Sequence, residues 1–190
     1  AGDQDVLGNA VYKWTGGWRN SFTYKGFNLG FLIDFKFGAK IFSGTNYQLY
    51  YYGMHKNTLN GRTPENPAGS IVAQGIDEVT GQPNTTAVTS QDYYRSICNA
   101  NIAEEFVYSA DFIKLRELSF GYTFPKKFLE PLKYVKGLSV SFVARNLWTI
   151  MKHTPNIDPE SAINNTNAQG LELNGYPATR NIGFNINVKF

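Results

Sequence analysis

Four tyrosines close together in the sequence are the residues best suited to contact a ligand, and they are Tyr47, Tyr50, Tyr51 and Tyr52. Aromatic side chains offer large amphipathic contact surfaces, so the group could contact an oligosaccharide, a peptide or a partner protein. The same rings would also suit the interface between a membrane and water. We prefer this membrane-interface interpretation, and we apply it to Trp148 and Tyr176 as well.

The histidines and the cysteine show no pattern typical of catalysis. His55 and His153 are far apart in the sequence, and Cys98 has no second cysteine with which to form a disulfide or a metal site. We therefore interpret all three as loop or packing residues. Nucleophile–base motifs, phosphate-binding loops and paired carboxylates are also missing from the sequence. The prediction is a protein that is not an enzyme and needs no cofactor.

Four acidic residues in two segments could offer oxygen ligands to calcium, and they are Asp77, Glu78, Asp158 and Glu160. Their spacing is not that of a calcium-binding helix–loop–helix motif. We prefer a simple turn in which Pro159 restrains the backbone, and we predict no metal site.

The composition points to β-structure. Aromatic residues make up 15% of the chain and charged residues only 17%, and aromatic side chains favour strands. The net charge of +3 is spread along the chain, so no basic patch for nucleic acid is expected. No apolar stretch reaches the length of about 18 residues that a membrane-spanning helix needs.

The end of the sequence alternates strictly between apolar and polar residues, which predicts a strand near 179–190. The apolar positions that we interpret as the C-terminal signal of an outer-membrane barrel are Phe184, Ile186, Val188 and Phe190. Lys189 falls on the opposite, polar side.

A second alternating segment predicts a strand near 28–42, whose polar side carries Asp34, Lys36 and Lys40. Burying these charges in a protein core would be unfavourable, whereas a water-filled barrel lumen accepts them. Arg145, in a further strand near 138–148, is expected to face the lumen too. Between residues 106 and 124 the apolar positions change from odd to even numbers, which predicts a β-bulge near Arg116 and Glu117.

With another strand near 18–24, the sequence predicts five antiparallel strands. Short links alternate with long ones near 43–105 and 149–178, as periplasmic turns alternate with extracellular loops in bacterial barrels. Five strands cannot close a barrel, which takes about eight or more. Because the start of the chain lacks the pattern of a signal peptide, we expect the chain to begin within a longer protein.

Several motifs resemble, in the expected order, those of SusC/RagA-type TonB-dependent outer-membrane transporters of Bacteroidetes. The segment 111–125 is similar to the family's LRxLxLGYxxP strand, and 144–148 to its NL strand. Residues 158–160 resemble its DPE loop, and 175–190 its closing motif. Segment 16–27 resembles a hairpin of the family. The variable loop around 54–105 carries no match.

The resemblance implies an all-β fold, the C-terminal five strands of a transmembrane barrel of about 22 strands with a plug. It also implies import of oligosaccharides or peptides across the outer membrane, energised by TonB and assisted by a SusD-like surface lipoprotein. The lipid bilayer and the rest of the barrel would be the other partners. Two alternatives stay open at this point: a secreted β-sandwich that binds carbohydrate, and a passive porin-like pore.

Overall fold

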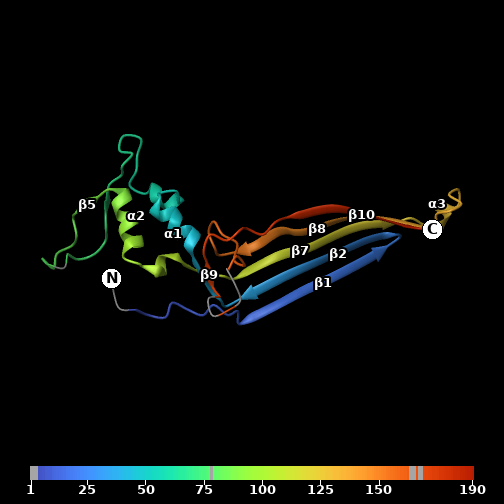
Figure 1. Cartoon of the computed structure of the whole chain (residues 1–190), viewed down its shortest axis with the longest axis horizontal. Helices are drawn as coiled ribbons and strands as arrows, with labels where there is room; N and C mark the ends of the chain where they lie inside the picture. Colours follow the sequence, from blue (N-terminus) through green and yellow to red (C-terminus); the bar gives the residue numbers. More distant parts are fainter. Residues whose placement is uncertain (1–3, 78, 163–165, 167–168) are drawn as a thin grey trace.

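The computed structural model describes residues 4–77, 79–162, 166 and 169–190. The described chain has two parts, a long twisted sheet and a smaller unit of helices and short strands at one end of it (Figure 1). We call the first the wall and the second, residues 40–109 with the short strand β9 (Leu171–Glu172), the loop unit.

The wall is a five-stranded sheet with the order β1-β2-β7-β8-β10, in which every pair is antiparallel. Its strands are β1 (Trp14–Tyr24), β2 (Phe27–Phe37), β7 (Phe112–Thr123), β8 (Gly137–Lys152) and β10 (Asn181–Lys189). β1 begins four residues before the expected strand, and β8 ends four residues after it. Because β1 and β10 each pair on one side only, both edges of the wall carry unpaired backbone groups.

The short and long connections lie at opposite ends of the wall (Figure 1). Lys25 and Gly26, both with positive φ, join β1 to β2 in a tight turn. At the same end the short helix α3 (Lys126–Leu129) connects β7 to β8, and the C-terminus lies beside it. The two long links leave from the other end. This arrangement agrees with the predicted alternation of turns and loops.

The predicted bulge is confirmed. Leu32 of β2 pairs with Glu117, and the next residue, Ile33, pairs with Leu115, so Arg116 is the extra residue of β7. The register with β8 shifts at the same place. The bulge therefore keeps the apolar residues on one face of the wall on both sides of Arg116.

The expected strand 28–42 is wrong in its last part. β2 ends at Phe37, and Gly38, with a φ of 89°, turns the chain into a separate strand, β3 (Lys40–Ser43). β3 pairs with β6 (Val107–Ser109) and β9 (Leu171–Glu172), outside the wall. Lys40 is therefore not on the polar face of β2, because that positive φ interrupts the alternation of side chains.

The loop unit contains helices that the sequence analysis did not predict. They are α1 (Gly44–Tyr51), α2 (Ser90–Asn99) and the 3₁₀ helices η1 (Lys56–Leu59) and η2 (Ala103–Phe106). The two-residue strands β4 (Ile71–Val72) and β5 (Ala87–Val88) form a hairpin. Ser43 caps α1 and Thr89 caps α2, each by accepting a hydrogen bond from a backbone N–H.

The loop unit has its own hydrophobic core, centred on Phe106. Tyr47 and Tyr50 of α1 contact the Phe106 ring edge-on, and Tyr94 and Cys98 of α2 lie in the same buried cluster. Cys98 is fully buried, in agreement with a packing role. Among the described residues, the helices are all too short or too polar to cross a membrane.

Candidate functional site

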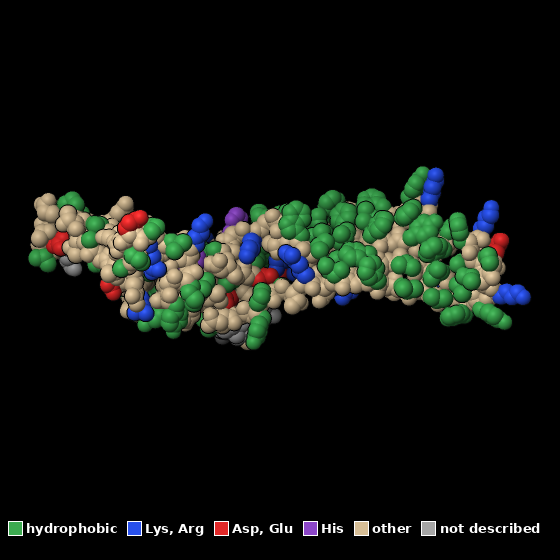
Figure 2. Space-filling model, turned by 90° about the horizontal axis from the view of Figure 1, so that it is seen from above, with side chains coloured by type: hydrophobic (Ala, Val, Ile, Leu, Met, Phe, Trp, Pro, Cys, Tyr) green, Lys and Arg blue, Asp and Glu red, His purple; other side chains and the backbone are tan. Residues whose placement is uncertain are grey.

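One face of the wall is mostly apolar, because most of the residues paired across the strands on that face are apolar; Asn20, opposite Phe31, is an exception. Trp18 lies opposite Ile33, Leu29 opposite Phe120, and Phe142 opposite Phe184. Figure 2 shows hydrophobic side chains covering the strand-bearing half of the molecule on the face in view. Several of these side chains are more than half exposed, and they include Trp18, Phe22, Phe184 and Ile186. No described element covers this face.

The other face of the wall is lined by small and polar residues, among them Ser21, Gly30, Ser119, Gly121, Ser141 and Asn185. Four of the five charged residues predicted to face the lumen lie on this side. They are Asp34 and Lys36 on β2, Arg145 on β8 and Lys189 on β10. The polar residues thus form a continuous surface opposite the apolar one.

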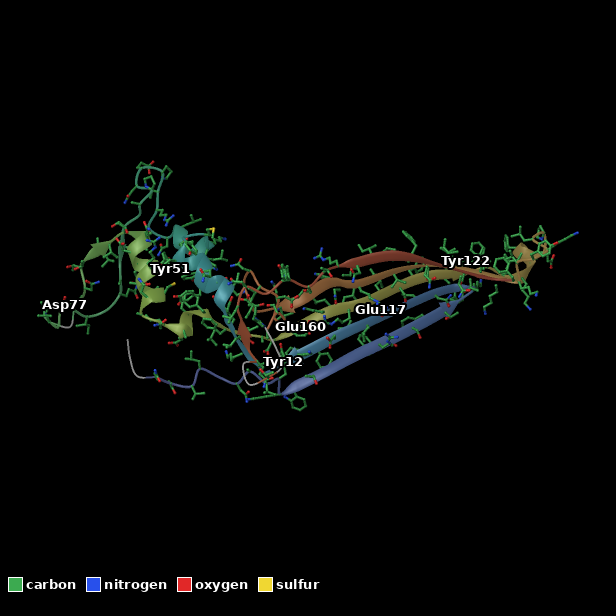
Figure 3. The ribbon with its side chains drawn as sticks, viewed as in Figure 1. Tyr12, Tyr51, Asp77, Glu117, Tyr122 and Glu160 are labelled. Carbon is green, nitrogen blue, oxygen red and sulfur yellow. The ribbon has the colours of Figure 1, made fainter. Side chains whose placement is uncertain are left out.

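A cluster of six charged residues, which we call the ion cluster, lies where this polar face meets the loops. Its members are Asp34, Lys36, Lys114, Arg116, Asp158 and Glu160. Figure 3 places Glu160 at the loop end of the strands, beside Tyr12, with Glu117 farther along the sheet. Three side chains are cationic and three are anionic, so their formal charges balance.

Arg116 connects the two sides of the ion cluster. The bulge turns its side chain to the polar face, where the guanidinium donates to Asp34 Oδ2 at 2.8 Å. The same group also donates to both carboxylate oxygens of Glu160 and to Asn146 Oδ1. Both hydrogen bonds to Glu160 come from Nη2, and hydrogen bonds between ionised partners are stronger than those between neutral ones. Arg116 therefore attaches the loop that carries Glu160 to the strands.

Lys114 makes a second attachment to the same loop. Its ammonium group donates to Asp158 Oδ1 at 2.6 Å and to Glu160 Oε2 at 2.8 Å, and its side chain is nearly buried. Lys36 reaches Glu160 Oε1 at 3.4 Å. Phe112, fully buried, lies below the three cations with its ring 4.9 to 5.8 Å from their charged groups.

The ionisation of Glu160 follows from these contacts. Burial alone opposes the charged form, but hydrogen bonds from Arg116 and Lys114 outweigh this effect and lower the pKa of Glu160 to about 2. Tyr12 lies against the cluster, and burial together with the nearby charge of Glu160 raises the pKa of Tyr12 to about 12. Glu160 is therefore ionised and Tyr12 is protonated at neutral pH.

The segment 158–160 is attached to the strands by ion pairs. Asp158 and Glu160 are occupied by Lys114 and Arg116, and Figure 3 shows Asp77 at the far side of the loop unit. Asp77 instead accepts hydrogen bonds from Val79 and Thr80. Glu78 lies outside the described residues. Within the part of the chain that is described, acidic, histidine and cysteine side chains form no group able to hold a metal.

A second buried carboxylate, that of Glu172, attaches the link between β8 and β10 to the start of α1. Glu172, on β9, is fully buried and accepts from the hydroxyl groups of Ser43 and Thr45 and from the backbone N–H of Thr45. Burial opposes its charge, yet these hydrogen bonds and one from Gly175 lower the pKa of Glu172. A carboxylate at this position also complements the positive end of the helix dipole.

The four tyrosines of the sequence analysis divide into two groups. Tyr50 is only 2% exposed and Tyr47 packs on Phe106, so both belong to the core of the loop unit. Tyr50 also lines a pocket between α1 and α2, and a ligand contact at Tyr47 or Tyr50 stays a prediction. Tyr52 is exposed and Tyr51 half-buried, and a ligand contact at these two stays a prediction.

The remaining aromatic and histidine residues differ in their surroundings. Trp148 lies on the apolar face opposite Leu115, near the loop end of β8, and Tyr176 is almost fully exposed. His55 packs on Tyr50 and accepts from the backbone N–H of Asn57, and burial lowers its pKa. Both contacts are structural, which agrees with a packing role.

No protein-family model matches this chain. Two curated proteins nevertheless align with 99% or more of it. It is 28% identical over 192 residues to the TonB-dependent receptor P39 of Formosa agariphila, and 26% identical over 194 residues to the TonB-dependent receptor P3 of the same organism. It spans 17% of the length of each of these relatives. Along its whole length, this chain is therefore similar to a segment of TonB-dependent receptors.

Two solved structures have the same fold as this chain. The RagAB peptide importer matches with a TM-score of 0.60 and 20% identity in its "open-open" state, over 93% of this chain. In its "closed-closed" state the TM-score is 0.63 and the identity 18%, over 97% of the chain. The segment corresponds to 17% and 18% of those chains. The sequence resemblance to SusC/RagA-type proteins is thus confirmed, and relatives named as receptors and importers support the prediction that it is not an enzyme.

Sequence reasoning missed the two residues that matter most in the ion cluster, Lys114 and Arg116. Their partners Asp158 and Glu160 are more than forty positions away in the sequence. The one local signal was the change of the apolar positions from odd to even numbers near Arg116. It predicted the bulge, but not that the Arg116 side chain would bind Asp34 and Glu160. Glu172 was missed because nothing in its immediate sequence shows that it would be buried.

Proposed function

We propose that this chain forms the last five strands and two extracellular loops of an outer-membrane importer driven by TonB. The observation that carries the proposal is the two-faced wall: apolar and exposed on one side, polar on the other, with both edges unpaired. Lipid suits the first face and a water-filled lumen the second, and the strands missing from this chain would pair with β1 and β10.

The charged residues of the polar face fit a lumen. Asp34, Lys36, Arg145 and Lys189 would face the transport path, and the ion cluster would hold the loop 149–178 against the inner wall at its outer mouth. Phe184, Ile186, Val188 and Phe190 would face lipid on the closing strand. These assignments are supported by the pairing register of β10 with β8.

The cargo and the partners are the less detailed part of the proposal. RagAB is named as a peptide importer, and the motif resemblance to SusC/RagA-type proteins implies import of oligosaccharides or peptides with a SusD-like lipoprotein over the outer loops. The loop unit, with half-buried Tyr51 and exposed Tyr52, would lie on that outer side. A secreted β-sandwich is disfavoured, because it would need a second sheet on the apolar face and no described element lies there.

The test compares uptake of labelled oligosaccharides and peptides by cells with and without the full-length gene, each with and without a functional TonB. We expect uptake of at least one compound that needs both the gene and TonB. Uptake that needs the gene but proceeds equally without TonB would favour the passive pore. Recovery of the full-length protein from the soluble fraction without detergent would contradict the barrel itself.

A further inference from the structure

The loop unit contains a small pocket between α1 and α2 whose lining is rich in tyrosine and arginine. Its volume is about 200 Å³, and its walls include Tyr51, Tyr52, Arg62, Gln91 and Arg95. Figure 3 shows Tyr51 in the loop unit, at the opposite end of the molecule from Tyr122. The pocket is thus separate from the ion cluster and would lie on the outer side of the membrane.

Both arginines of the pocket lack an anionic partner. No acidic side chain is among its lining residues, and neither Arg62 nor Arg95 makes an ion pair within residues 4–77, 79–162, 166 and 169–190. The Arg62 Nε–H is buried without any acceptor. Leaving such a donor unpaired is unfavourable, so a buried one calls for a partner.

The contacts of Arg95 hold it in place without neutralising it. Its guanidinium lies over the Tyr51 ring at 5.2 Å, and its Nε donates to the Tyr51 carbonyl at 3.4 Å. When the side-chain amide group of Gln91 is rotated so that its oxygen and nitrogen exchange places, the oxygen accepts a hydrogen bond from Arg95 Nη1 at 2.7 Å. All three contacts are with neutral groups. The positive charge of Arg95 therefore remains available to a ligand.

We propose that this pocket binds a carboxylate group of the imported compound. This inference rests on the proposed import function and names the chemical class of the cargo. A carboxylate matches the planar donors of arginine, and the pocket is large enough for that group but not for a whole oligomer. The rings of Tyr51 and Tyr52 would contact the adjoining sugar ring or peptide unit.

The ion cluster provides the comparison that supports this assignment. There, each of the three cations faces a carboxylate of the chain itself. In the pocket, two arginines lie together with none. Like charges that line one pocket disfavour each other, and a bound anion would offset both.

The test measures binding to the full-length, detergent-purified protein by calorimetry. The acidic probes are trigalacturonate and triglutamate, and the neutral ones are galactotriose and triglutamine, with both tripeptides N-acetylated and C-amidated so that only the side chains differ in charge. We expect at least one acidic probe to bind about tenfold or more tightly than its neutral counterpart. Arg95→Gln should remove that difference, and Lys127→Gln, on α3 at the far end, should not. Which acid binds distinguishes an acidic sugar from an acidic peptide.

Three results would overturn the inference: equal binding of acidic and neutral probes, binding of neither acid, or acid binding that survives Arg95→Gln. Arg62→Gln provides a second variant, and circular dichroism would show whether each variant is folded. Cells that still take up compounds through TonB in any of these cases would leave the proposed import function standing while removing the carboxylate site.

Discussion

In the wall the large apolar side chains lie on the surface, whereas in the loop unit they lie inside. Phe184 and Phe190 of the wall are 77% and 78% exposed, while Phe106 and Tyr50 of the loop unit are 1% and 2% exposed. In the proposed barrel, a bilayer and neighbouring strands would cover these apolar atoms. The loop unit has a core of its own, as a water-soluble domain does.

The ion cluster lies between these two parts. It pairs charges of β2 and β7, on the polar face of the wall, with carboxylates of the long loop. A substitution in the wall, in the loop unit or in the ion cluster should therefore destabilise that region and leave the other two unchanged. Variants in the loop-unit core, on the apolar face and in the ion cluster should have different local effects.

The largest effect is expected for Phe106→Ala in the loop unit. Removing this buried ring should destabilise the loop unit by about 3–5 kcal/mol, because it leaves a cavity between α1 and α2. Hydrogen exchange measured on the full-length protein should become faster in both helices and stay unchanged in β2 and β7. Phe128→Ala, at an exposed position on α3, is the control. Unchanged exchange in α1 and α2 would contradict the core assignment.

The apolar face can be tested with Phe184→Arg against its sequence neighbour Asn185→Arg. A charge facing lipid near the middle of a strand should cost about 2–4 kcal/mol, whereas the same charge on the polar face should cost little. Unfolding by urea in lipid vesicles would measure the difference. If the two variants were equally destabilised, the two faces would not be distinct in their surroundings.

Arg116→Ala tests the ion cluster. It leaves Asp34 and Glu160 without their shared partner, and because the site is partly exposed we expect a loss of about 1–3 kcal/mol. The loop 153–162 should then be cut more readily by protease. Arg19→Ala, at an exposed arginine 3.7 Å from Glu117, should change little. Equal protection of the loop in both variants would mean that Arg116 does not anchor it.

The smallest effect is the pH dependence of the same anchor. Because the pKa of Glu160 is lowered to about 2, its contribution is fully present above the usual value of a glutamate, about 4.3, and is lost as the pH falls toward 2. Protease protection of the loop should be constant from pH 7 to 5 and decline below. Glu160→Gln should show a weaker decline. A loss of protection above pH 5 would point to another group.

Alternation of side chains was enough to predict the wall and its bulge, because every strand has one apolar and one polar face. It failed at Ala39 and Ile41, which continue the apolar alternation of β2 yet are buried in the loop region. Only the backbone turn at Gly38 separates them, and glycine by itself does not specify a turn. α1 was missed because its tyrosines face a core that forms by packing with distant residues, not by a local apolar stripe.

The central claim, that one face of the wall contacts lipid and the other contacts water, can be tested most directly with single cysteines. Phe184→Cys and Asn185→Cys would be placed in full-length protein carrying Cys98→Ser, and intact outer membranes would be treated with a water-soluble maleimide. We predict that the cysteine at position 185 reacts readily and that the one at position 184 is protected until the membrane is dissolved. Ready reaction at 184 with protection at 185, or equal reaction at both, would contradict the account.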